Sequence, residues 1–319
     1  MPRNRQTSKS QTKRTNVNFL TQHLISITGF NDCKFSSFAF TMSLYITSLN
    51  SGSNGNCYYV GNLREAVLID AGISCRETEK RIARSGLSFN KIKAVFITHE
   101  HTDHTRGVEA IARKYRIPVY ITSLTYKNSS LQLDENVIHS FDTNVPVCIG
   151  ELSIRAFPKF HDAREPHSFT VTGNGITIGI LTDIGSACGN VIQHFSQCHA
   201  AFLEANYDEV MLEEGSYPLF LKNRIRGNEG HLSNEQALEL FTRHKSPFMS
   251  HLLLSHLSEN NNSPHLVRDL FMKQACGTNI AIASRYKESS VYCISGTYVA
   301  IEPIKTTAQA MLPIQMSLF

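Results

Sequence analysis

The segment 99–104, His-Glu-His-Thr-Asp-His, places three histidines and one aspartate within six residues. It directly follows the apolar run 92–97, which predicts a buried strand. The spacing is too irregular for one helix face, so we expect a loop in which the first two histidines share one side, while the aspartate and the last histidine turn away. Imidazole and carboxylate bind zinc, manganese and iron, and two ligand pairs suit two adjacent ions. The candidate ligands are His99, His101, Asp103 and His104, and a histidine-rich surface loop is the alternative.

The composition indicates a folded protein of one large or two small domains. The 319 residues are 41% hydrophobic, 18% charged and 9% aromatic, which supports a substantial core and argues against disorder. No apolar run reaches the ~18–20 residues of a membrane span, so we expect no membrane association. The eight cysteines form no Cys-x-x-Cys pair, which argues against a disulfide framework or a zinc knuckle and favours the reducing cytoplasm.

The positive charge of the chain lies at its N-terminus. Residues 1–41 carry six basic residues and one acidic residue, whereas the net charge of the whole chain is +4. The rest is therefore close to neutral, and the charge is no argument for a nucleic-acid-binding face. Residues 2–18 are polar and predicted to be disordered, and 19–30 match a signal peptide poorly. We expect a dispensable extension over 1–41 with Met42 as the functional start, a folded domain over 42–302 and a tail over 303–319.

From residue 42 onward, apolar strand-like runs alternate with amphipathic stretches. Ser233-Asn234-Glu235-Gln236 predicts a capping box that opens a helix. Many strands follow one another as hairpins, with helices between the groups, which favours a mixed α/β (α+β) fold of two packed sheets with helices outside. The expected strands are 43–48, 56–60, 65–70, 92–97, 117–122, 137–141, 151–158, 167–172, 176–182, 199–205, 250–255, 278–283 and 291–294. The expected helices are 75–85, 106–115, 188–196, 216–225, 233–244 and 264–275.

Further candidate site residues stand at predicted strand ends or strand-to-helix turns, where groups distant in sequence can converge. Taken singly, each is more often an ordinary buried or surface residue than a ligand. Combined with the cluster at 99–104, they predict one shared site. Asp70 follows another buried strand and either orients a ligand from behind or forms a turn or helix N-cap. The other candidates are His161, Asp183, His231 and His256.

These motifs resemble those of the metallo-β-lactamase-fold hydrolases, whose His-x-His-x-Asp-His signature stands at 99–104. The chain is more closely similar to the WalJ/YycJ-type nuclease subfamily, with matches in order over residues 43–260. Tyr207 departs from the pattern, because many relatives are expected to carry histidine there. The resemblance implies a four-layer αβ/βα sandwich with metals at the sheet edges. The matching segments are 51–56, 68–72, 98–107, 160–163, 182–185 and 204–206. A longer match runs from 217–218 through 224–225 to 230–234.

The resemblance also implies a centre of two divalent ions, Zn²⁺, Mn²⁺ or Fe²⁺. Such a pair activates water and clamps a phosphate oxygen. Related phosphodiesterases such as the tRNA-processing RNase Z enzymes carry two late histidines, which implies that His231 is the general acid and His256 a ligand. Asp103 and Asp183 are the other implied catalytic residues. The implied ligands are His99, His101 and His161 for one ion, and Asp103, His104 and His256 for the other, with Asp183 bridging.

The ligand types favour phosphodiester cleavage over β-lactam or thioester hydrolysis. Lys222 and Arg224 are close in sequence to His231 and could hold backbone phosphates, with Asn206 as a third candidate substrate contact. A solvated helix face is the alternative for the two cations. The resemblance implies a 5′→3′ DNA exonuclease in DNA repair, with DNA favoured over RNA. The alternatives are a cyclic phosphodiesterase for small molecules, a glyoxalase II-like thioester hydrolase, and a non-catalytic metal-binding regulatory module.

The last five residues, Gln-Met-Ser-Leu-Phe, resemble the bacterial sliding-clamp-binding motif, with Met316 in the usual leucine position. A short extended peptide that buries two apolar side chains in a partner's pocket suits a chain terminus. Packing of the tail on its own domain is the alternative. The predicted clamp contacts are Gln315, Leu318 and Phe319.

Overall fold

The structure is a computed structural model that describes residues 43–296. Several predictions concern the rest of the chain and lie outside the described residues. These are the extension 1–41, Met42 as the start, the tail 303–319, and the clamp contacts Gln315, Leu318 and Phe319.

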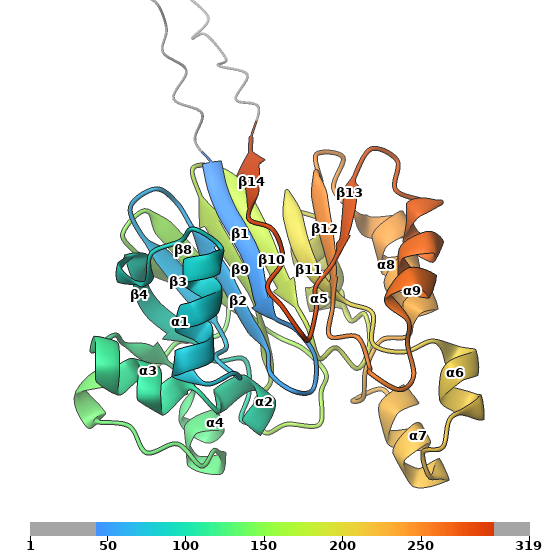
Figure 1. Cartoon of the computed structure of the whole chain (residues 1–319), viewed down its shortest axis with the longest axis horizontal. Coiled ribbons are helices and arrows are strands. Elements are labelled where there is room, and N and C mark those ends of the chain that lie inside the picture. The colour runs from blue at the N-terminus through green and yellow to red at the C-terminus, as the bar shows by residue number, and fades with distance from the viewer. Residues whose placement is uncertain (1–42, 297–319) are drawn as a thin grey trace, which may run out of the picture. The chain divides into compact units, whose positions relative to one another are not determined.

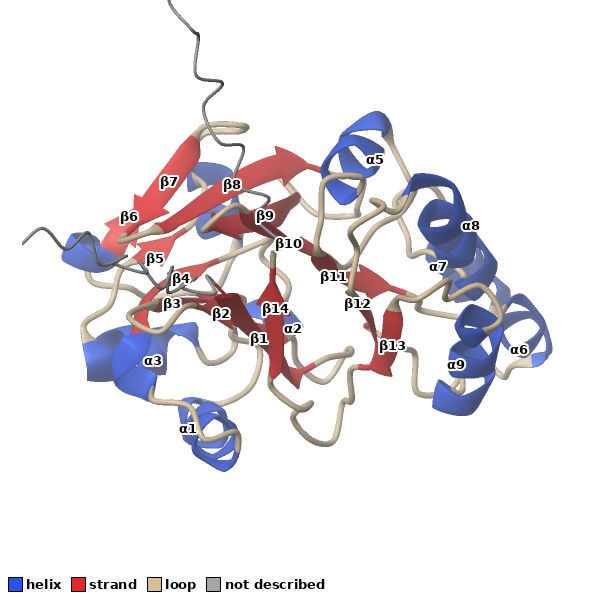
Figure 2. Cartoon of the chain, turned by 90° about the horizontal axis from the view of Figure 1, so that it is seen from above, coloured by secondary structure: helices blue, strands red, loops and turns tan. Residues whose placement is uncertain are grey.

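Within residues 43–296, two sheets of seven strands each form the centre of the fold (Figures 1 and 2). The first sheet has the order β14-β1-β2-β3-β4-β5-β6, and β3 to β6 run parallel. Its strands are β1 (Ser43–Asn50), β2 (Cys57–Gly61), β3 (Ala66–Ile69), β4 (Ile92–Phe96), β5 (Val119–Tyr120), β6 (Ile138–His139) and β14 (Tyr292–Ser295).

The second sheet has the order β13-β12-β11-β10-β9-β8-β7. Strands β10 to β13 run parallel, whereas β7 to β10 pair antiparallel. The strands are β7 (Pro146–Ile149), β8 (Leu152–Pro158), β9 (His167–Gly173), β10 (Ile176–Leu181), β11 (Ala200–Glu204), β12 (His251–Ser255) and β13 (Asn279–Ile282).

Helices cover the outer faces of both sheets. Figure 1 shows α1 (Cys75–Arg84) and α3 (Val108–Tyr115) on one side of the sheets, and α8 (Asn234–His244) and α9 (Pro264–Met272) on the other. The remaining helices are α2 (Thr102–Thr105), α4 (Ser123–Asn128), α5 (Gly189–Phe195), α6 (Glu209–Glu214) and α7 (Leu219–Arg226), with 3₁₀ turns at Phe89–Lys91 and Glu135–Val137. The predicted capping box opens α8, where Ser233 and Gln236 exchange hydrogen bonds.

Three apolar clusters hold the four layers together. The first lies between the sheets and includes Phe96, Phe169 and Phe202. The second packs α5, α8 and α9 on the second sheet, and the third packs α1 and α3 on the first sheet. Because both faces are covered, central strands such as β3 and β11 are buried along their whole length. The predicted four-layer αβ/βα sandwich is confirmed.

The local predictions were wrong mainly in short elements. The loop expected over the His/Asp cluster contains the helical turn α2, so a change of direction along a helix, and not a bend of a loop, separates Asp103 from His99. The short elements β7, α4 and α6 were missed, because a segment of four to six residues carries little periodicity. The described cysteines are all free. No helix within 43–296 is long and apolar enough to cross a bilayer.

Candidate metal centre

The candidate residues converge because the strands that carry them end at the same edge of each sheet. Strands β10, β11 and β12 are parallel, so their carboxyl ends are neighbours. Strand β8 pairs antiparallel with β9, and β9 with β10, so β8 ends at that same edge. Strands β3 and β4 are parallel in the other sheet. The residues that follow these ends include Asp70, the cluster at 99–104, His161, Asp183 and His256, and Glu204 closes β11.

Three of these residues adopt left-handed backbone conformations. The φ angles are 60° for Asp70, 53° for Asp183 and 55° for His256. Asp70 and His256 directly follow the last residue of a strand, and Asp183 follows the end of β10 after one intervening residue. At these positions the left-handed conformation reverses the direction of the chain. Left-handed conformations are unfavourable for residues other than glycine and concentrate at functional sites, where surrounding contacts maintain them. Here the turn directs each side chain toward the shared edge.

One glycine lets the His/Asp cluster approach strand β3. A Cβ at Gly72 would lie 1.6 Å from the carbonyl oxygen of Asp103, so no other residue fits without moving the backbone. The approach is fixed by backbone hydrogen bonds, including those from Asn56 N to Asp103 O (2.7 Å) and from Ala71 N to His104 O (2.9 Å). The segments 51–56, 68–72 and 98–107 are therefore parts of one packed unit.

The first ligand group consists of His99, His101 and His161, whose nitrogen atoms lie within 4.8 Å of one another. His99 Nε2 lies 2.9 Å from His101 Nδ1. His161 Nδ1 donates to Gly230 O (3.2 Å), and this orients its Nε2 atom, which is buried and has no hydrogen-bond partner. Each of the three imidazoles thus presents one nitrogen atom to a common point.

The second group consists of Asp103, His104 and His256, also within 4.8 Å of one another. His104 Nε2 lies 3.4 Å from Asp103 Oδ2, and His256 Nε2 lies 3.8 Å from the same oxygen. Asn56 Nδ2 donates to Asp103 Oδ2 (3.1 Å). The Nε2 atom of His256 is buried without a hydrogen-bond partner.

Asp183 lies between the two groups and is 2% exposed. Its Oδ2 atom is 3.1 Å from His104 Nε2, and its Oδ1 atom is 3.9 Å from His161 Nε2. One carboxylate thus faces a histidine from each group. Asp183 is therefore a candidate ligand for an ion at either group.

Asp70 is fully buried behind the cluster. It accepts hydrogen bonds from Thr98 N (2.9 Å) and Thr98 Oγ1 (2.9 Å), and its Oδ2 atom accepts from His104 Nδ1 (2.7 Å). Thr98 Oγ1 also lies 2.9 Å from His99 Nδ1. Asp70 therefore orients His104 directly and His99 through Thr98, so that the Nε2 atom of each ring faces the site. It is not a helix N-cap, because Ser74 caps α1.

Glu204 also belongs to the candidate site, although the sequence pointed to no role for it. It is fully buried, and its Oε1 atom accepts from both His231 Nδ1 (2.8 Å) and His256 Nδ1 (2.9 Å). Its Oε2 atom accepts from Ile184 N (2.6 Å). The signal that could have identified it is an acidic residue closing an entirely apolar strand, as Asp70 does after β3.

Neighbouring charges oppose the effect of burial on the pKa of His256 and of Glu204. Burial lowers the pKa of His256, but Asp183, Asp103 and Glu204 outweigh it and raise that pKa to about 10. Burial raises the pKa of Glu204, but His231 and His256 lower it to about 2. Burial lowers the pKa of Lys159, which donates to Thr182 O (2.7 Å) beneath the site. The Glu204 carboxylate is thus ionised although it is fully buried.

The donor set fits divalent metal ions. Imidazole nitrogen and carboxylate oxygen are the ligands of zinc, manganese and non-haem iron sites. Buried polar atoms normally have partners, whereas His161 Nε2, His256 Nε2 and Asp183 Oδ2 have no hydrogen-bond partner. A metal ion among these atoms would satisfy them. The site supports divalent metal binding.

A hollow of about 370 Å³ opens over the site. Arg224 lines it together with His231, and the Arg224 guanidinium donates to Asp162 Oδ2. Lys222 donates to the carbonyl oxygen of Glu213. Asn206 donates to the carbonyl oxygen of His256 (2.8 Å). The structure thus brings Arg224 to the hollow, places Asn206 behind a candidate ligand, and directs Lys222 toward α6.

Comparison with known proteins places this geometry in a family. A model of the beta-lactamase superfamily domain matches residues 65–257, which contain every candidate ligand. The chain belongs to the beta-lactamase superfamily. Exodeoxyribonuclease YycJ of Bacillus anthracis is 32% identical over 232 residues, which are 71% of this chain and 87% of that protein. Exodeoxyribonuclease WalJ of Streptococcus pneumoniae is 30% identical over 244 residues, 75% of this chain and 91% of that protein.

The solved structures agree on the fold. The metallo-β-lactamase fold protein YhfI from Bacillus subtilis has a TM-score of 0.61 at 15% identity, over 79% of this chain and 99% of that one. A diphosphatase of the PhnP family has a TM-score of 0.55 at 17% identity, over 80% and 99%. The resemblance to WalJ/YycJ-type members of the superfamily is confirmed, and the chain is a metal-dependent hydrolase.

Proposed function

We propose that this chain is an exodeoxyribonuclease that hydrolyses DNA phosphodiester bonds at a centre of two divalent ions. The observation that carries the proposal is the pair of His231 and Glu204 beside the metal ligands. Departure of a sugar alkoxide requires a proton, and we assign its donation to His231, which lines the open hollow. Two relatives named exodeoxyribonucleases, at 32% and 30% identity, support DNA as the substrate.

The proposal assigns the ligands to two groups, each of which gathers its donor atoms within 4.8 Å of one another. His99, His101 and His161 would hold one ion, whereas Asp103, His104 and His256 would hold the other. Asp183 faces both groups and would be a ligand for both ions. Bound divalent ions supply an activated water and charge stabilisation for a phosphoryl oxygen. Zn²⁺, Mn²⁺ and Fe²⁺ all suit these ligands.

The remaining chemistry belongs to side chains of this chain. Glu204 accepts a hydrogen bond from Nδ1 of His231, which leaves Nε2 to hold the proton for the leaving oxygen. Asp103 and Asp183 orient the reacting groups. Arg224 is placed to bind a non-bridging phosphate oxygen, and Asp162 fixes its guanidinium. Cleavage in the 5′→3′ direction, a role in DNA repair and a cytoplasmic location are parts of this proposal.

A substrate panel tests the proposal. Purified protein, loaded in turn with Zn²⁺, Mn²⁺ and Fe²⁺, is incubated with 5′-phosphorylated and unphosphorylated DNA, matched RNA and a small cyclic phosphodiester. We expect stepwise release of nucleotides from the 5′ end of DNA and none with Asp103→Ala. Release from the 3′ end would overturn the polarity, and cleavage of the small ester alone would favour a cyclic phosphodiesterase.

We also propose that the C-terminal tail binds a bacterial sliding clamp, which would keep the enzyme on DNA. The proposal rests on the sequence of the last five residues. A labelled peptide of residues 310–319 should bind purified clamp, and Leu318→Ala with Phe319→Ala should weaken binding at least tenfold by removing the buried anchors. A peptide of the same composition in scrambled order is the control. Equal binding of the native and scrambled peptides would contradict this proposal.

A further inference from the structure

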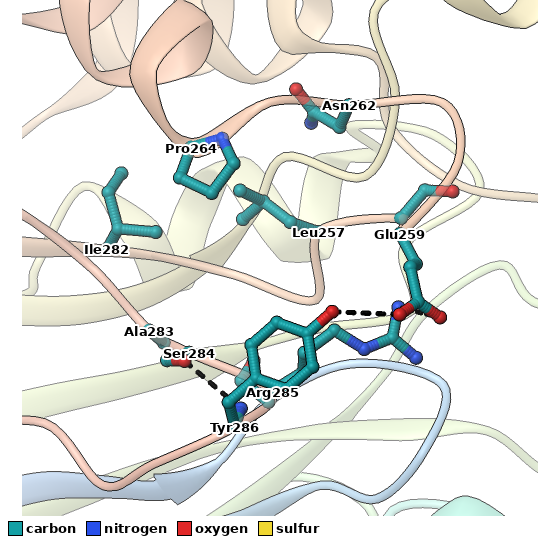
Figure 3. Close-up of a pocket in the computed structure, with 11 residues that line it drawn as sticks. Leu257, Glu259, Asn262, Pro264, Ile282, Ala283, Ser284, Arg285 and Tyr286 are labelled. Carbon is teal, nitrogen blue, oxygen red and sulfur yellow. Dashed lines mark hydrogen bonds and ion pairs between the residues drawn. The ribbon is translucent and has the colours of Figure 1, made fainter.

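A second pocket adjoins the metal centre at the ends of β12 and β13 (Figure 3). Its volume is about 250 Å³. Figure 3 shows Tyr286 and Arg285 on one side, across from Leu257, Pro264 and Ile282 on the other. The pocket is thus a slot with mainly apolar walls and an aromatic ring at its rim.

The pocket shares its wall with the proposed metal site. Leu257 directly follows the candidate ligand His256. Ser51 lines the pocket, and its Oγ atom accepts a hydrogen bond from His256 N (2.7 Å). Arg285 Nη2 donates to Ser53 Oγ (3.4 Å), and Ser53 lines the hollow over the metals. The slot and the hollow over the proposed metal site are therefore neighbours.

Hydrogen bonds to three backbone carbonyl oxygens hold the rim of the pocket in place. Their donors lie in the β1–β2 turn and in α1, beside the first sheet. Ser284 O accepts from Ser51 N (3.1 Å), Arg285 O accepts from Asn54 Nδ2 (2.9 Å), and Tyr286 O accepts from Arg81 Nη2 (3.1 Å). These bonds fix three successive residues. The rim is therefore pre-organised, which reduces the entropic cost of binding.

Tyr286 is 71% exposed, yet it has a fixed orientation. Its hydroxyl donates to Glu259 Oε1 (2.8 Å), and its backbone N–H donates to Ser284 Oγ (3.0 Å). An exposed aromatic ring that is held at the mouth of an apolar slot offers a stacking surface for a planar ring.

The charges in the pocket favour a base over a phosphate. Arg285 Nη1 lies 3.2 Å from Glu259 Oε2, so the cation that lines the pocket is already paired and is not free to hold a phosphate. The Glu259 carboxylate can still accept a hydrogen bond from an exocyclic amino group. A nucleobase combines an apolar face, a planar ring and such an amino group.

We infer that this pocket binds a single unstacked nucleobase of a single-stranded DNA substrate, next to the scissile phosphate at the metals. The inference rests on the proposed function and adds to it a base-binding subsite with Tyr286 as the stacking residue. An enzyme that removes a base from its stack in this way recovers part of the cost through stacking on the protein.

The experiment uses single-stranded oligonucleotides with phosphorothioate linkages, each carrying 2-aminopurine at one of the first six positions from the 5′ end. With the full chain, we expect 2-aminopurine fluorescence to be quenched at one position. Tyr286→Ala should abolish the quenching and weaken binding about tenfold, the range of one base–aromatic stack. Tyr286→Phe keeps the ring and should retain both effects. Ile282→Phe fills the slot and should act like Tyr286→Ala.

Cleavage kinetics with an abasic site at the quenched position complete the test. The abasic substrate should lower kcat/KM about tenfold for the unaltered protein and leave the Tyr286→Ala variant without further loss. Phe248→Ala, at an exposed aromatic on the loop before β12, is the matched control. The inference would be overturned if the abasic site and Tyr286→Ala lowered kcat/KM additively, each by its own full factor. It would also be overturned if the quenching persisted in Tyr286→Ala. Quenching without any cleavage would instead contradict the proposed nuclease function and leave the subsite standing.

Discussion

Replacing His231 by alanine should lower the rate of DNA cleavage about 10²- to 10⁴-fold while the metal content stays close to that of the unaltered protein. The His231 side chain is 21% exposed and faces the hollow, where it can donate a proton to a leaving oxygen. His256→Ala should instead lose metal, because the buried His256 Nε2 atom has no other partner. Metal analysis of both purified variants, together with their cleavage rates, tests this division.

The leaving group provides a sharper form of the same experiment. A nitrophenolate departs without a proton, so a nitrophenyl phosphodiester should be hydrolysed by His231→Ala with a much smaller loss than DNA. His256→Ala should lose activity on both substrates. His265→Ala, at an exposed histidine of α9, is the control and should match the unaltered protein. Loss of metal from His231→Ala with retention in His256→Ala would reverse the two assignments.

Glu204→Gln should weaken metal binding and activity about 10- to 100-fold, the usual effect of removing a residue that orients metal ligands. Glu204 accepts from two histidine Nδ1 atoms and from the backbone N–H groups of Ile184 and Leu232. A glutamine side chain has one acceptor oxygen, and its NH₂ group would face other donors. The buried mismatch should also lower the stability by about 1–3 kcal/mol.

Metal affinity is measured by competition with a chelator, and stability by thermal unfolding of the metal-free protein. Glu239→Gln, at an exposed glutamate of α8 that pairs with Arg243, is the matched control and should change neither quantity. Metal affinity equal to that of the unaltered protein in Glu204→Gln would show that His231 and His256 are oriented without this carboxylate.

The sequence predicted the layers well because long, strongly apolar strands carry a clear pattern. The run 200–203 is buried along its whole length, and the strand predicted there is present as β11. The helical turn at Thr102–Thr105 was missed because one turn is shorter than the period needed to recognise it. The ligand types at 99–104 need no tertiary structure to be noticed, because their density alone is unusual for a surface loop.

The sequence by itself determined the fold class, the family resemblance and the inventory of imidazole and carboxylate groups at strand ends. Only the tertiary structure decided which of those groups face one another. Glu204 meets His256 because β11 and β12 are parallel neighbours, and the turn before α8 brings His231 to the same carboxylate. Asn206, just after β11, lies behind His256 for the same reason. These contacts join segments up to 52 residues apart, as in the bond between Glu204 and His256, and no local pattern encodes such a pairing.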